Sequence, residues 1–143
     1  MLATGNRADH GFTLIEGLVV VAITALLAGL MFPRLQGVIT GQEFRSARAQ
    51  MLMGLSETRA LAVRSGAAAS FRVGQGGASF RVGNRPDLSV PDSVRLRFAE
   101  QRNLVTFYPD GTSDGGRLAL TGRDKRQEFI IFPTTGIVAE ARQ

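Results

Sequence analysis

The stretch GFTLIEGLVVVAITALLAGLMFPRL, residues 11–35, decides the architecture that the rest of the chain has to accommodate. Nearly every residue in the range 12–32 is apolar, and a run of this length is about what a helix needs to cross the hydrocarbon core of a bilayer. Glu16 is the exception. A carboxylate at the centre of the hydrocarbon costs roughly 2.5–3.5 kcal/mol even on lenient insertion scales, so we expect Glu16 to have a partner or a function.

Two general kinds of apolar N-terminal segment fit this stretch only in part. A cleaved secretory signal has an apolar region of about 7–15 residues followed by small residues at a cleavage site. Here the apolar run is longer and continues through residues 28–30 into Met31 and Phe32. A plain single-pass anchor explains the length of the run, but it explains neither Glu16 nor the glycine directly before Phe12.

A third interpretation explains both features. Residues 11–16, Gly-Phe-Thr-Leu-Ile-Glu, resemble the cleavage site of type IV pilins and of the pseudopilins of type II secretion. In that family a membrane-bound prepilin peptidase cuts after the glycine and methylates the new N-terminus. The resemblance implies that residues 1–11 are a leader, that cleavage falls between Gly11 and Phe12, and that Phe12 becomes an N-methylphenylalanine. It extends to Pro33, where the family often has a helix-bending proline.

Cleavage after Gly11 would supply the missing partner of Glu16. The new amine on Phe12 lies four residues before Glu16, so the two opposite charges share one helix face and each lowers the other's cost of leaving water. In the family this glutamate meets the N-terminal amine of a neighbouring subunit in the filament, and the contact sets axial register. We therefore expect Glu16 to act in assembly.

The helical pattern continues beyond the apolar run. We predict a helix from Phe12 to about Arg64, with residues 12–33 as its membrane-spanning or filament-core half and residues 34–65 as its amphipathic half. In the second half, apolar and small residues recur at spacings of three and four and predict one buried face: Phe44, Ala47, Met51, Leu55, Thr58 and Ala62.

From Gly66 the hydrophobic period changes to two, which predicts strands. The sequence ASFRVG occurs at residues 69–74 and again at 78–83, separated by QGG, and this arrangement predicts a β-hairpin. Further strands are expected at residues 94–98, 104–108, 117–121, 127–132 and 136–140, with a loop at residues 86–91. The predicted fold is α+β, a long N-terminal helix packed on an antiparallel β-sandwich of about six to eight strands in residues 66–143.

The composition argues against an enzyme. The chain has no cysteine, and its only histidine, His10, precedes the apolar run, so the following domain has no imidazole for acid–base catalysis or metal binding. Asp110 and Asp114 lie in a glycine-rich turn without the acidic alternation of a calcium loop. Residues 74–77 precede a strand rather than a helix, so they favour a hairpin loop over a phosphate site. We expect no catalytic residue, metal or cofactor.

The chain is strongly basic, which leaves several kinds of partner open. The net charge is +5, and of its 17 basic residues only Lys125 is lysine. Arg72, Arg81, Arg95 and Arg97 alternate with apolar residues and form a candidate basic sheet face. Such a face could bind DNA through its phosphates, but a solvated strand face has the same pattern, and we favour that interpretation.

A second resemblance lies in the C-terminal half, at residues 107–111, 116–120, 129–131 and 135–138. These turns and apolar strands are similar to those of the GspH/FimT family of minor pseudopilins and pilins, in which a β-sandwich rests on the long helix. Many adhesive pilins close a C-terminal loop with a cysteine pair, and its absence favours a pseudopilin. The Gly-Arg-x-Arg element of DNA-binding members is replaced by Gly-Ile-Val-Ala at residues 136–139, which argues against DNA as a partner.

Together the two resemblances imply a minor pseudopilin, an assembly subunit of the type II secretion pseudopilus that exports folded proteins across the outer membrane. Its implied partners are the prepilin peptidase, other major and minor pseudopilins, the inner membrane and the secreted exoprotein. Its implied topology is single-pass in the bacterial inner membrane, with a cytoplasmic N-terminus and a periplasmic C-terminal domain. Two alternatives remain: a FimT-like minor type IV pilin of pilus assembly or DNA uptake, and a plain membrane-anchored domain.

Overall fold

The computed structural model describes residues 13–141, apart from the side chains of residues 30–40. The chain divides into two compact units, Met1–Val38 and Ile39–Gln143, which are described separately. One helix, α1 (Leu14–Ser65), supplies all the described residues of the first unit except Thr13, and it is also the first element of the second unit. Its bounds agree with the helix predicted from the sequence. Among the residues described in full, no helix is both long enough and apolar enough to cross a membrane.

The end of α1 has a local cause. Gly66 follows the last helical residue and has a φ of 65°, the left-handed conformation that glycine adopts readily after a helix. Arg64 in the last turn places a positive charge near the negative end of the helix dipole. The chain therefore leaves the helix at this point and enters the first strand.

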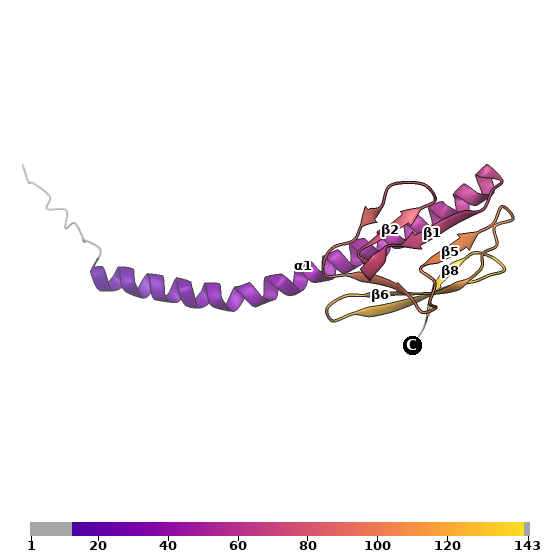
Figure 1. Cartoon of the computed structure of the whole chain (residues 1–143). Helices are drawn as coiled ribbons and strands as arrows, with labels where there is room; N and C mark the ends of the chain where they lie inside the picture. The colour runs from indigo at the N-terminus through magenta and orange to yellow at the C-terminus, as the bar shows by residue number, and fades with distance from the viewer. Residues whose placement is uncertain (1–12, 142–143) are drawn as a thin grey trace, which may run out of the picture. The chain divides into compact units, whose positions relative to one another are not determined.

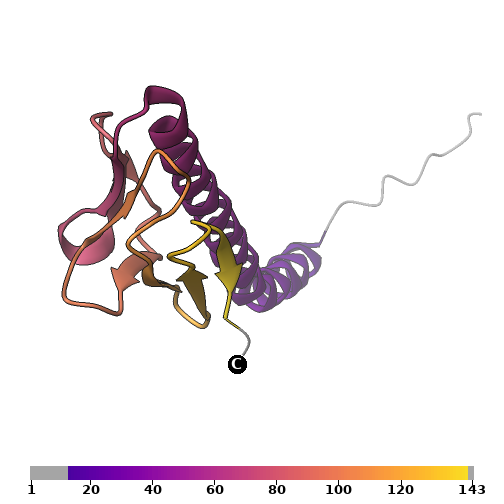
Figure 2. The same ribbon diagram turned by 90° about the vertical axis from the view of Figure 1, so that its right-hand side faces the viewer.

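The second unit contains two four-stranded antiparallel sheets (Figure 1). Sheet A has the order β3-β2-β1-β5, and sheet B has the order β4-β6-β7-β8. The strands are β1 (Ala69–Val73), β2 (Ser79–Val82), β3 (Leu88–Ser89), β4 (Arg95–Phe98), β5 (Leu104–Phe107), β6 (Gly116–Thr121), β7 (Arg126–Ile131) and β8 (Val138–Glu140). Figure 2 shows the C-terminal half of α1 running along one side of these strands. The predicted helix-and-sandwich fold is confirmed, with eight strands.

The predicted hairpin is present, and one predicted loop is wrong. β1 and β2 pair with Arg72 opposite Arg81, and the short 3-10 turn η1 (Gln75–Gly77) joins them. Residues 86–91 were expected to form a loop, but Leu88 and Ser89 make the short strand β3 beside β2. A two-residue strand between two prolines has no detectable alternation, so only its pairing with β2 reveals it.

The core lies between α1 and the two sheets. All six residues of the predicted helix face are buried. Gly54 lies in the same stretch of helix, and a Cβ there would come within 2.8 Å of Cε2 of Phe80 and 3.0 Å of Cε2 of Phe71. The two rings stack with their centroids 5.1 Å apart. The absence of a side chain at Gly54 therefore lets the helix backbone lie directly on the aromatic rings of sheet A.

The two sheets make a close backbone contact at the turn η1. Gly77 has a φ of 73°, and a Cβ there would lie 2.2 Å from the carbonyl oxygen of Leu96 on β4. The hairpin of sheet A is thus packed against the first strand of sheet B without an intervening side chain. Its neighbour Gly76 has a φ of 71°, but a Cβ there would meet nothing within 4 Å.

These two glycines form a matched pair for a stability test. Gly76→Ala introduces only the left-handed strain, about 1–2 kcal/mol. Gly77→Ala introduces the same strain and also forces the Leu96 carbonyl away, for which we expect a further loss of about 1–3 kcal/mol. Urea unfolding of the full chain in detergent, followed by circular dichroism, measures both. Equal destabilisation by the two substitutions would contradict the close contact with β4.

Candidate functional site

The first turn of α1 is capped by Thr13. The backbone N–H of Glu16 donates to the Thr13 side-chain oxygen Oγ1 at 3.3 Å and to the Thr13 carbonyl oxygen at 3.0 Å. Gly17 N–H also donates to that carbonyl, at 3.2 Å. Threonine followed three residues later by glutamate is the sequence of a capping box. No role was predicted for Thr13 from the sequence, although the spacing of Thr13 and Glu16 indicates the cap.

Glu16 itself lies in this first turn and is exposed. A carboxylate here faces the positive end of the helix dipole, which stabilises its charge by about 0.3–1 kcal/mol at an exposed site. Gly11 and Phe12, the predicted cleavage pair, lie outside the described residues. The proximity of the Phe12 amine to Glu16 therefore stays a prediction.

Around Glu16 the helix is apolar on every side. In the first unit its large apolar side chains are exposed, from 49% for Val19 to 87% for Leu14. They are Leu14, Ile15, Leu18, Val19, Val20, Val21, Ile23, Leu26 and Leu27. The one hydroxyl among them, that of Thr24, donates within the helix to the Val20 carbonyl oxygen at 2.7 Å. A helix that is apolar all round is stable only when lipid or protein covers it.

Pro33 was predicted to bend the helix. Its backbone is helical, and α1 is assigned without interruption through it. Its side chain lies outside the described part of the structure. The bend at Pro33 stays a prediction.

The four candidate basic residues do not form one sheet face, which corrects the prediction. Arg72 and Arg81 lie on β1 and β2 of sheet A, whereas Arg95 and Arg97 lie on β4 of sheet B. The alternation of charged and apolar residues is the same in all three strands, so the sequence could not show that they belong to different sheets.

The environments of these arginines differ as well. Nε of Arg81 lies 2.6 Å from Oδ1 of Asp87, and this hydrogen bond raises the pKa of Arg81 and lowers the pKa of Asp87. Arg95 donates to the carbonyl oxygens of Asp92 and Val94, at 2.9 and 2.7 Å. Arg97 makes no ion pair or hydrogen bond with another side chain among the described residues.

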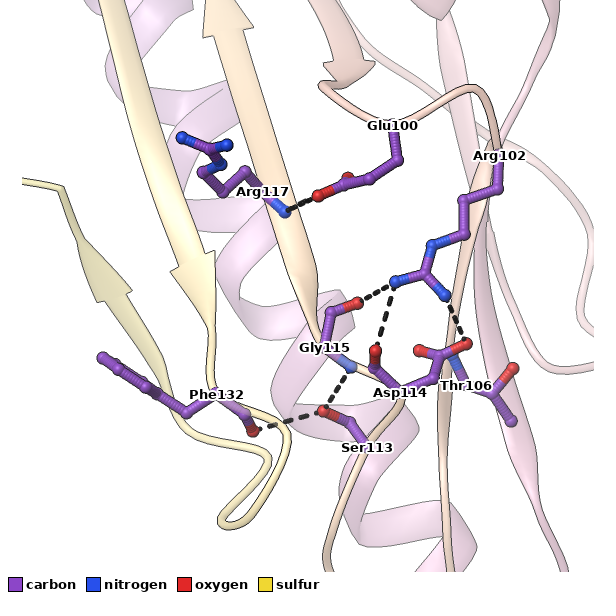
Figure 3. A network of polar contacts seen from close by, with 8 residues as sticks. All are labelled: Glu100, Arg102, Thr106, Ser113, Asp114, Gly115, Arg117 and Phe132. Carbon is purple, nitrogen blue, oxygen red and sulfur yellow. Dashed lines mark hydrogen bonds and ion pairs between the residues drawn. The ribbon is translucent and has the colours of Figure 1, made fainter.

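A polar network ties the two sheets together beside the glycine-rich turn (Figure 3). Arg102, in the connection between β4 and β5, contacts the Asp114 carboxylate at 3.1 Å. It also donates to the backbone carbonyl oxygens of Asp114 and Gly115, at 3.2 and 2.5 Å. The other Asp114 oxygen accepts from Thr106 N–H on β5 at 2.9 Å. One guanidinium group thus links the start of β6 in sheet B to β5 in sheet A.

The neighbouring contacts continue this linkage. The Glu100 carboxylate accepts from Arg117 N–H on β6 at 3.2 Å. Ser113 donates from its hydroxyl to the Phe132 carbonyl oxygen at 3.3 Å, and its Oγ accepts from Gly115 N–H at 3.1 Å. The loops after β5 and β7 are therefore held to each other by side chains as well as by the backbone bond from Ser113 N–H to Pro133 O.

The aspartates of the glycine-rich turn are already engaged. Asp110 accepts from the hydroxyl and the N–H of Thr112, at 2.6 and 3.0 Å, and these bonds lower its pKa. Asp114 pairs with Arg102 as described. Within the described residues no group of three or more His, Cys, Asp or Glu side chains is placed to hold a metal ion. The hydrogen bonds of Asp110 to Thr112 and the ion pair of Asp114 with Arg102 stabilise the turn itself.

α1 also reaches these loops through Arg59. Its Nε donates to the Gly111 carbonyl oxygen at 3.1 Å. Gly136, with a φ of 60°, packs so closely that a Cβ would lie 2.4 Å from that same oxygen. The role of Arg59 was not predicted from the sequence, because a charged residue on a helix face does not by itself indicate a tertiary contact.

The chain is similar to known proteins both in its N-terminal segment and over most of its length. Residues 6–32 match the family described as the prokaryotic N-terminal methylation motif. Over an alignment of 141 residues, the chain is 29% identical to the type II secretion system protein H of Xanthomonas campestris pv. campestris, with 93% of this chain and 83% of that protein covered.

Solved structures share the fold. The type IV minor pilin FimU of Pseudomonas aeruginosa PAO1, in its P21 crystal form, has a TM-score of 0.61 at 16% identity, covering 71% of this chain and 90% of FimU. The minor pseudopilin EpsH from the type 2 secretion system of Vibrio cholerae has a TM-score of 0.52 at 12% identity, covering 67% of this chain and 93% of EpsH.

The protein thus has a type IV pilin-like architecture, with an N-terminal methylation motif, a long helix and an antiparallel sandwich. The resemblance predicted from the sequence is confirmed in its motif, in its overall similarity to a protein H of type II secretion, and in its fold.

The Arg102 network yields a test of its structural role. We expect Arg102→Gln to lower the free energy of unfolding by about 1–2 kcal/mol. The substitution removes a charge-assisted contact between the sheets, and partial exposure to solvent limits the strength of that contact. Arg72→Gln is the matched control, since Arg72 is exposed on a strand and should change stability by less than about 0.5 kcal/mol.

The turn that contains Asp110 and Asp114 is tested with calcium. Thermal unfolding of the wild-type protein should have the same midpoint temperature with calcium as with EDTA. A higher midpoint temperature with calcium would show that these aspartates bind a metal ion.

Proposed function

We propose that this chain is a minor pseudopilin of a type II secretion system, a structural subunit of the periplasmic pseudopilus rather than an enzyme. The observation that carries the proposal is Glu16, a single carboxylate in the capped first turn of α1, where the large apolar side chains from Leu14 to Leu27 are exposed. In a soluble domain the apolar side chains of such a helix would face water, which is unfavourable. In a filament of packed helices these side chains are buried and the carboxylate has a charged partner.

The similarity to protein H over nearly the whole chain supports type II secretion in particular. A minor type IV pilin is the second candidate, and the fold shared with FimU supports it. In either machine the proposed partners are the prepilin peptidase, other pilin-like subunits and, for a pseudopilin, the secreted protein.

We propose that the subunit is first inserted in the inner membrane. Residues 1–11 are the leader on the cytoplasmic side, residues 12–33 hold the chain in the bilayer until extraction, and the domain from residue 66 onward lies in the periplasm. The length and apolarity of residues 12–32 in the sequence support this anchoring.

The cleavage assignment is tested at Gly11. Gly11→Val should leave the protein uncut, because a branched side chain does not fit the small pocket that a peptidase selecting glycine must have. Mass spectrometry of the membrane-extracted protein should show the wild type without residues 1–11 and with one added methyl group, and the variant at full length. Gly17→Ala is the control, since a Cβ at Gly17 meets nothing within 4 Å. Normal processing of the Gly11 variant would show that the cleavage site is wrong.

The assembly role is tested at Glu16. Glu16→Ala should be cleaved and inserted normally, because a costly group has left the apolar segment, yet it should fail to join the filament. Loss of one partner of a buried ion pair costs about 3–5 kcal/mol, so we expect at least about tenfold less protein in sheared filaments.

Thr24→Ala provides the control for that experiment. Thr24 is polar and lies in the same apolar segment, but its hydroxyl is satisfied within the helix, so its loss should leave incorporation unchanged. Wild-type incorporation of Glu16→Ala would remove the register role, and an equal defect in both variants would indicate a general requirement of the helix.

A further inference from the structure

The outer face of sheet B is rich in arginine. Residues on one side of the sheet are buried: Leu96, Phe98, Leu118, Leu120, Phe129 and Ile131. Side chains alternate along strands, so the residues between them point to the opposite side, away from the core. That side carries Arg95 and Arg97 from β4, Arg117 from β6 and Arg126 from β7, all of them exposed. We call these four residues the sheet B arginines.

Strand register brings the sheet B arginines together. Arg95 is paired with Thr121, which is paired with Arg126, and Arg97 is paired with Ala119. Neighbouring strands are about 4.8 Å apart, and alternate residues are about 6.8 Å apart along a strand. The backbone positions of these arginines therefore lie close together on the face of the sheet. A shallow depression there is lined by Arg97, Arg117 and Arg126, with the small side chains of Ala99 and Ala119 among its lining residues.

Three of the four sheet B arginines form no ion pair with a described residue. Among the strand residues that point outward from sheet B, the one carboxylate is Glu128, and it pairs with Arg126 at 2.5 Å. Neither Arg97 nor Arg117 forms an ion pair with a described residue. Arg97 pairs with Ala119, so Arg97 and Arg117 occupy diagonal positions on adjacent strands, within reach of a common ligand for side chains as long as these.

We propose that the outer face of sheet B docks an acidic segment of a partner protein, with Arg97 and Arg117 as its principal contacts. Guanidinium groups bind carboxylates through paired hydrogen bonds, and the small residues between them let an extended segment approach the sheet. The inference rests on the proposed function, because it names the chemistry by which a filament subunit would recognise a neighbouring subunit.

A protein fits this face better than a nucleic acid. Strong binding of duplex DNA requires many phosphate contacts, whereas here one of four arginines is already paired with Glu128. Single-stranded nucleic acid is held by aromatic stacking, and the outward-pointing strand residues of this face include no aromatic side chain. The half-buried Ile130 beside Arg117 instead offers apolar contact suited to a polypeptide.

The test uses the full-length protein in neutral detergent and two fluorescent probes, a peptide of ten glutamates and a duplex DNA of twenty base pairs. The test variant is Arg97→Glu with Arg117→Glu. The matched control is Arg45→Glu with Arg72→Glu, which changes the net charge equally at exposed arginines outside this face. Fluorescence anisotropy should show peptide binding that weakens with salt and falls at least about tenfold in the test variant but less than about threefold in the control.

Each contrary result overturns the docking proposal. Absence of peptide binding removes the acidic-segment site, and an equal loss in both variants assigns the binding to net charge alone. Tighter binding of the DNA, lost in the test variant, would make this face a nucleic-acid site.

Measuring incorporation into filaments distinguishes failure of the proposed function from failure of the docking proposal. If the wild type never enters a filament, the proposed function fails while the binding result stands. If the processed test variant is incorporated and secretes as the wild type does, the docking face alone is wrong.

Discussion

Apolar surface on a single helix is the constraint on which this structure depends. In its second half, α1 buries one face against two sheets, and Gly54 lets the helix backbone lie against the rings of Phe71 and Phe80. In its first half the apolar side chains, from Leu14 to Leu27, have no cover within the described chain. The chain therefore stabilises its own domain at one end of the helix and requires an external apolar environment at the other.

Polar contacts then hold the domain that the helix supports. Arg102 joins β5 of one sheet to the start of β6 in the other, and Arg59 reaches from α1 to the Gly111 carbonyl oxygen. These arginines are satisfied inside the domain, whereas Arg97 and Arg117 on the outer face of sheet B are not. Arginine therefore links elements of the domain at some positions and is exposed without a carboxylate partner at others.

Much of the fold could be predicted because its periodicities are local. The spacing of residues such as Met51 and Leu55 predicted the buried helix face, and the repeated ASFRVG sequence predicted the hairpin of β1 and β2. Short or long-range features could not be predicted. β3 has two residues and exists through its pairing with β2, and Arg59 has a role only because Gly111 approaches it in space.

The sequence by itself determined the N-terminal motif, the long apolar stretch interrupted by Glu16, and the order of helix and strands, because each is a property of neighbouring residues. The tertiary structure decided how the strands divide between sheets. It separated Arg72 and Arg81 from Arg97 and brought Arg97 beside Arg117 instead. Alternation assigns a side chain to one face of a strand, but only hydrogen bonding between distant strands determines which residues share that face.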